Sequence, residues 1–172
     1  MKTLLFILFS VVAVTAQPSN FADVKAQVEA LNDKQMFVDF NKFSESVTVG
    51  ARPDGVVASC FAVKPKTGAS FTGVIFERSG KEWEWLSVSS LRFIADETRG
   101  EWKDGTRRSQ ITSSRYNVTV YERLLFAPTD AQFEQVFNAK KAELQISFRE
   151  YTILPKALAQ CSTAYKLAKT LL

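Results

Sequence analysis

Residues 56–77 read VVASCFAVKPKTGASFTGVIFE, and this stretch sets the expected fold class of the 172-residue chain. Two runs rich in β-branched and aromatic residues flank a segment with proline and glycine, which is the composition of two strands joined by a turn. Further runs of this kind, also bounded by turn residues, lie at residues 82–89, 91–95 and 115–126. Because no helical pattern separates these runs, the sequence predicts an antiparallel meander that forms a barrel or a sandwich.

Helical patterns flank the predicted strands instead of interrupting them. Apolar residues recur at helical spacing over residues 21–31, and Thr129-Asp130-Ala131-Gln132 matches the capping box that begins a second helix. A third helix is expected in the tail, where apolar residues from Leu158 to Leu172 share one side. Residues 144–149 alternate between apolar and polar side chains, as a half-buried strand does.

The N-terminal residues 1–16 have the pattern of a cleaved secretory signal. Lys2 precedes an apolar run over residues 4–14 and a small-residue exit at residues 14–16. The apolar run is too short to span a bilayer, and no later window is long and uncharged enough to do so. We therefore expect a secreted protein with no membrane partner, whose residues 17–172 form one monomeric domain.

Cys60 and Cys161 are the two cysteines of the sequence. In an oxidising compartment they are expected to form one structural disulfide, which closes a loop of about 100 residues and stabilises the fold by roughly 4.7 kcal/mol. The bridge would tie an early strand to the C-terminal tail. The alternative is a pair of free, buried thiols.

Composition excludes several classes of function. The bases are spread along the chain, with Arg107-Arg108 the densest pair, so we expect no nucleic-acid partner. The sequence holds no histidine, which excludes a Ser-His-Asp triad, a Cys-His dyad and histidine zinc sites. Glu82 and Glu84 are the acidic pair nearest to a glycosidase arrangement, but we expect both to face water. The prediction is a binding protein with no metal, no cofactor and no enzymatic activity.

The N-glycosylation sequon Asn117-Val118-Thr119 orients one predicted strand. A glycan on Asn117 must point outward, so the even-numbered residues of this strand face inward. Glu122 is the acid among them. An isolated buried carboxylate is costly, so it should be paired, hydrogen-bonded or kept for a cationic ligand. The alternative is that a bulge reverses the inward and outward positions of this strand, or that Glu122 lies hydrated at the open rim of the barrel. The inward set is Tyr116, Val118, Val120, Glu122, Leu124 and Phe126.

Aromatic residues complete the expected binding site. Trp83 and Trp85 share one face of the strand predicted at residues 82–89, and Phe71 shares a face with Gly73 and Ile75. Facing inward, such rings form flat walls for an aromatic amine or a lipid chain. The alternative is that they only fill the core. The expected ligand-binding residues are Phe71, Trp83, Trp85, Tyr116 and Glu122.

The order of these parts resembles a lipocalin. The meander is followed by the capped helix and one strand, in the sequence AQFEQVFNAKKAELQISF from Ala131, and then by LAQC ending at Cys161. The N-terminal helix leading into residues 36–40, with Cys60 following Gly55, resembles the salivary, histamine-binding type of lipocalin from blood-feeding arachnids. The resemblance implies an antiparallel eight-stranded barrel with an N-terminal helix, a helix after the last meander strand and a C-terminal helix.

The resemblance also implies a function. It indicates a carrier or scavenger of a small amphipathic molecule, either a biogenic amine or a lipid mediator, held inside the barrel. A second class of function stays open, in which the barrel is a filled scaffold. Exposed loops such as residues 96–105 would then bind a host protein, for example a protease, a complement component or a cytokine.

Overall fold

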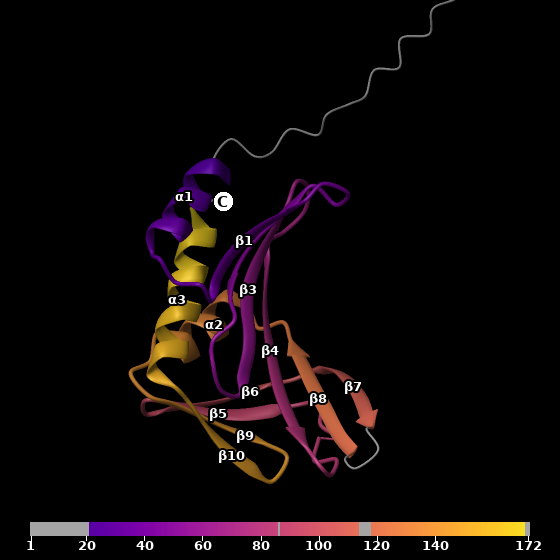
Figure 1. Cartoon of the computed structure of the whole chain (residues 1–172). Coiled ribbons are helices and arrows are strands. Elements are labelled where there is room, and N and C mark those ends of the chain that lie inside the picture. The colour runs from indigo at the N-terminus through magenta and orange to yellow at the C-terminus, as the bar shows by residue number, and fades with distance from the viewer. Residues whose placement is uncertain (1–20, 86, 114–117, 171–172) are drawn as a thin grey trace, which may run out of the picture.

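The computed structural model describes residues 21–85, 87–113 and 118–170. Within them, two antiparallel sheets and three helices surround one core, and Figure 1 shows the smaller sheet crossing one end of the larger one. The larger sheet has the order β1 (Met36–Asn41), β2 (Ser46–Ala51), β3 (Val57–Pro65), β4 (Phe71–Gly80), β8 (Val118–Phe126) and β7 (Thr106–Ser113). The smaller sheet has the order β10 (Arg149–Ile153), β9 (Ala142–Ile146), β5 (Leu91–Ala95) and β6 (Thr98–Trp102).

The predicted class, a mainly β antiparallel domain with three helices, is confirmed, but no closed eight-stranded barrel forms among the described residues. The meander ends at β4, which pairs with β8 and not with the next strand along the chain. Residues 82–89 were expected to be a strand, and their described part is a loop. The physical reason is that the N–H groups of Glu84 and Trp85 donate to a side-chain carboxylate instead of a neighbouring strand.

Two further expectations about strands need correction. Residues 96–105, expected to be a loop, contain β6, because Asp96 adopts a φ of 51° and turns the chain between the paired residues Ala95 and Thr98. Residues 144–149, expected to be one strand, contain the end of β9, a turn at Ser147 with a φ of 58°, and the start of β10. Both differences are tight hairpin turns without glycine at the positive-φ position.

The helices follow the sequence patterns closely. Helix α1 spans Phe21–Ala30, α2 spans Asp130–Phe137 and α3 spans Pro155–Lys169. The capping box is confirmed, since the Thr129 hydroxyl accepts from the N–H of Gln132 and the Gln132 side chain accepts from the N–H of Thr129. The expected tail helix is present as α3 and begins at Pro155, a residue type that the first helical turn tolerates. No helix among the described residues has the length and apolarity needed to cross a membrane.

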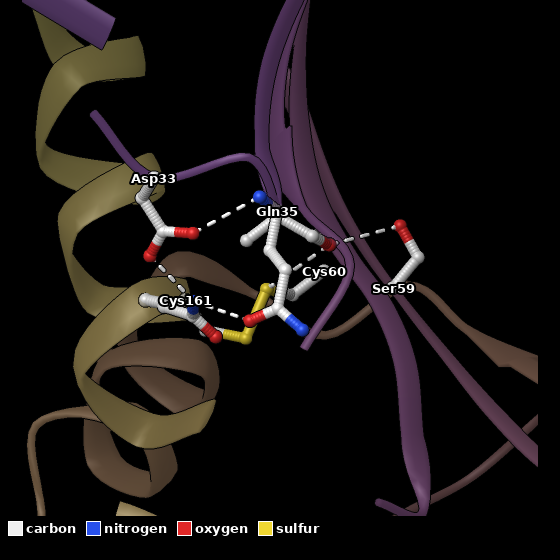
Figure 2. The surroundings of a disulfide bond; sticks show 7 residues. Asp33, Gln35, Ser59, Cys60 and Cys161 are labelled. Atoms are coloured by element: carbon white, nitrogen blue, oxygen red, sulfur yellow. Dashed lines mark hydrogen bonds between the residues drawn. A yellow bond between two sulfur atoms is a disulfide. The ribbon is translucent and has the colours of Figure 1, made fainter. Parts of the chain in front are cut away.

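A disulfide anchors α3 to the larger sheet (Figure 2). Cys60 on β3 and Cys161 on α3 are bonded across a sequence separation of 101 residues, as predicted. Beside the bridge, the side chain of Gln160 donates to the Asp33 carboxylate at 2.6 Å and to Gln35 at 2.7 Å. The backbone N–H of Gln35 also donates to Asp33 at 2.9 Å, and the bonds to Asp33 from Gln160 first and from this N–H second lower the pKa of its carboxyl. The helix is therefore held both covalently and by a polar contact to the chain before β1.

Aromatic side chains fill the space between the two sheets. Trp102 on β6 packs against Phe76, Phe93, Phe126 and Phe137, with ring centroids 5.8 to 6.4 Å apart. Phe133 on α2 stacks on Tyr165 of α3 at 5.0 Å, which connects the helices to the same core. The core between the two sheets is therefore packed with the protein's own aromatic rings.

Candidate functional site

Glu122, the acid expected inside, is fully buried on β8. The strand alternates as predicted, with Val120, Leu124 and Phe126 buried on the same side, whereas Val118 at the strand's start is 53% exposed. The Glu122 carboxylate accepts from the backbone N–H of Glu84 at 2.9 Å and from that of Trp85 at 2.8 Å. Two consecutive N–H groups of the loop between β4 and β5 therefore bind one side chain of β8.

An arginine completes the environment of Glu122. The guanidinium of Arg78, directly opposite on β4, donates to Glu122 at 2.7 Å and to Glu84 at 2.8 Å. Glu84 also pairs with Arg149 of β10 at 3.3 Å. The four charged groups alternate in sign, which links the larger sheet, the loop and the smaller sheet. Glu122 thus takes two of the three roles open to a buried acid: it is paired and hydrogen-bonded.

The protonation of Glu122 follows from these contacts. Burial by itself raises the pKa of the carboxyl, but the N–H of Glu84, the Arg78 guanidinium and the N–H of Trp85 together lower it below its ordinary value. Glu122 is therefore ionised near neutral pH, and its charge is balanced inside the protein.

Of the other expected binding residues that the structure describes, Trp85 lies beside Glu122 through its backbone N–H, but Phe71 does not. Trp85 is fully buried against Tyr151, with ring centroids 6.0 Å apart, but Trp83 is only half-buried in the same loop. Phe71 lies at the far end of β4 and is 51% exposed, because the core side of that strand carries Val74 and Phe76. Tyr116 and the sequon residue Asn117 lie outside the described residues.

A groove lies over the outer face of the smaller sheet, with a volume of about 410 Å³. Leu91, Phe93 and Ala95 of β5 are buried in the core, so the alternate residues Arg92 and Ile94 point outward. Across the sheet, Arg92 is opposite Gln145 and Glu101, and Ile94 is opposite Glu143 and Arg99. The outward side chains that line this outer groove are Arg92, Ile94, Arg99, Glu143, Gln145, Glu150 and Thr152.

The charges of the outer groove are incompletely paired. Arg92 and Arg99 have no ion pair with any described residue, whereas Glu143 pairs with Lys141 at 2.7 Å. Glu150 is the other acid in the groove. The lining carries two arginines and two glutamates, so its formal charges balance, but Glu143 is already paired with Lys141 outside the lining, whereas neither arginine has an ion pair with a described residue. Ile94 is 39% exposed between the two arginines and supplies an apolar surface.

A second hollow of about 330 Å³ adjoins the outer groove. Its lining includes Ser87, Ser89, Ser90 and Ser147, and it shares Arg92 and Gln145 with the groove. Arg92 therefore lies where the two hollows meet. The sequence analysis missed this site, although the alternation Leu91-Arg92-Phe93-Ile94-Ala95 already placed Arg92 and Ile94 on one face of a strand.

The fold and the groove define a β-rich domain with a disulfide-anchored helix and a polar groove outside its core. Comparisons of the chain with models of protein families, with curated proteins and with solved structures found no match.

Proposed function

We propose that this chain is a secreted, non-enzymatic binding protein that carries or sequesters a small amphipathic organic acid in its outer groove. The observation that carries the proposal is the pair of unmatched guanidinium groups, Arg92 and Arg99, beside the exposed Ile94. Arginine binds carboxylates through two parallel hydrogen bonds, and a side chain such as Ile94 contacts a hydrocarbon tail. The groove volume is within the range of small-molecule sites.

The proposal retains the carrier function implied by the lipocalin resemblance but moves the ligand to the outside. A relationship to lipocalins remains part of the proposal. The packing of Trp102 against four phenylalanine rings supports an exterior site, because a ligand inside would have to displace those contacts.

An acid is favoured over an amine by the state of Glu122. The amine hypothesis needs this carboxylate to be available, and it is bound by Arg78 and by the two loop N–H groups. An amine would have to replace Arg78 and desolvate a second charge, which is costly in a buried position.

Secretion and the absence of catalysis are also proposals. The Cys60–Cys161 bridge fits an oxidising compartment, and the predicted signal at residues 1–16 lies outside the described residues. The sequence has no histidine, and Glu84, one of the two acids considered for hydrolysis, is bound by Arg78 and Arg149.

The groove is tested with decanoate as the probe and calorimetry as the measurement. Replacing Arg92 or Arg99 by Gln should weaken decanoate binding by about 1.5–3 kcal/mol, the range for a hydrogen bond to a charged group, or roughly tenfold to 150-fold in Kd. Arg52→Gln is the matched control, because Arg52 lies over the Phe37 ring on the other sheet. Decylamine binding as tightly as decanoate, or equal affinity in all three variants, would refute the proposal.

Asn117 should carry a glycan when the protein is made in a eukaryotic secretory pathway. An amidase that removes N-glycans should increase the mobility of the wild-type protein in a gel. Thr119→Ala, which removes the sequon but leaves Asn117 in place, should abolish the shift. If neither the enzyme nor the substitution changes mobility, the protein does not receive the glycan and the secretion proposal loses that support.

A further inference from the structure

The edge of the larger sheet is formed by β7, and this strand is unlike the others that the structure describes. All eight residues of Thr106–Ser113 are exposed, and β7 pairs with β8 along its whole length without a register shift. Neither face is covered by a helix or by the other sheet within the described residues. One row of its backbone N–H and C=O groups therefore has no neighbouring strand.

Edge strands of this length usually carry features that prevent pairing with another chain. Proline, bulges and short lengths are common protections, and β7 has no proline and no bulge. Its protection is positive charge, because Arg107 and Arg108 project from opposite faces of the strand and neither has an ion pair with a described residue. This charge disfavours a basic strand and favours an acidic one.

The charge extends beyond β7. Arg108 lies directly opposite Arg123 on β8, and Glu77, the acid on the same side of the sheet among the described residues that line this region, already pairs with Arg123. Two arginines facing each other across a sheet repel, so an external carboxylate near Arg108 would relieve that repulsion. A hollow of about 530 Å³ runs along this side of β7, between Glu77, Arg108 and Tyr121. Ile111, 56% exposed on the opposite face, offers an apolar contact.

We propose that β7 binds an extended acidic segment of a partner protein, which adds to the larger sheet as a further antiparallel or parallel strand. Main-chain hydrogen bonds to the free edge supply the affinity, and Arg107 and Arg108 each select an acidic side chain on their own face of the added strand. This surface is separate from the outer groove, which lies on the smaller sheet. It therefore adds a protein partner to the small-molecule function and does not depend on it.

The probe is a labelled peptide with two adjacent glutamates among valines, acetyl-VVVEEVVV-amide, whose glutamates project from opposite faces when it is extended, and fluorescence anisotropy measures its binding to the full domain. We expect the charge-reversed peptide, with lysine in place of glutamate, to bind at least about tenfold more weakly. The double variant Arg107→Gln/Arg108→Gln should weaken the acidic peptide by about two- to thirtyfold, as expected for two exposed ion pairs. Arg52→Gln, directly after β2 at the other side of the same sheet, should leave binding unchanged.

Backbone pairing is tested separately from charge. A version of the acidic peptide with N-methyl groups on alternate residues keeps its charges but cannot donate one row of hydrogen bonds, and it should lose binding. Amide exchange of residues 106–113 should slow when the unmethylated peptide is added. If the methylated peptide binds as tightly as the unmethylated one, the surface is a simple cationic patch and strand addition is overturned. The same conclusion follows if heparin binds as tightly as the acidic peptide. Concentration-dependent dimers of the free protein that disappear in the double variant would also overturn it, because the edge would then pair with a second copy.

Discussion

Replacing Glu122 by Ala is expected to lower the free energy of unfolding by about 3–5 kcal/mol, the range for removing one member of a buried ion pair. The loss is large because Arg78 and the N–H groups of Glu84 and Trp85 all lose their acceptor. The loop between β4 and β5 would then lack its attachment to β8. Urea denaturation followed by tryptophan fluorescence measures the effect.

The chain contains a matched control at the neighbouring register position. Glu77 and Arg123 are also an ion pair between β4 and β8, but they lie on the outer face and their charges are placed in the opposite order. Because this pair is exposed to solvent, Glu77→Ala should cost no more than about 1 kcal/mol. Equal costs for the two substitutions would mean that Glu122 contributes no more than a surface charge.

Acidity should act on stability through the same residue. The pKa of Glu122 is lowered in the folded protein, so its contribution is complete above the ordinary pKa of glutamate, about 4.3, and declines as pH falls through and below that value. The Glu122→Gln variant has no such proton to bind. Its free energy of unfolding should therefore fall less than that of the wild type between about pH 5 and pH 3.

Loss of the disulfide should have an effect of similar size. Cys60 and Cys161 are 101 residues apart, and the chain-entropy model gives about 4.7 kcal/mol for a loop of about this length, within a usual range of 2–5 kcal/mol for native bridges. We expect the double variant Cys60→Ala/Cys161→Ala to keep its circular dichroism spectrum but to unfold at lower urea concentration. Gln160 and its two partners hold the same part of α3 non-covalently, so the helix should remain docked.

Reduced wild-type protein is the control for the cysteine variants, because reduction removes the bridge without deleting sulfur atoms from the core. Reduced protein and the double variant should unfold at closely similar urea concentrations. A midpoint that does not move on reduction would contradict a stabilising role for the bridge.

Local patterns predicted the parts of the fold that depend on local chemistry. The capping box at Thr129, the alternation of β8 and the cysteine pair are each decided by a few neighbouring residues or by composition. The burial of Glu122 followed from the parity that the sequon at Asn117 suggested. That residue lies outside the described residues, so the glycan itself stays a prediction.

Strand partners could not be predicted in the same way. Residues 82–85 carry two tryptophans and look like a strand, but their N–H groups bind Glu122, 37 or 38 positions along the chain. Because of that long-range contact, residues 82–85 do not pair with β4, and β8 pairs with β4 instead. The outer groove depends on the pairing of β5 with both β6 and β9, which brings Arg92, Arg99 and Glu143 together. No local pattern shows which strands will be neighbours.

The central claim, that a small acid binds outside the core, is tested most directly by isotope-filtered NOE spectroscopy. The protein would carry labelled Ile, Leu and Val methyl groups, and the ligand would be unlabelled decanoate. The account predicts NOEs between the decanoate chain and the methyl groups of Ile94 on the outer face of β5. NOEs to the core methyl groups of Val74, Leu124 or Val136, without any to Ile94, would contradict it and place the ligand in the interior.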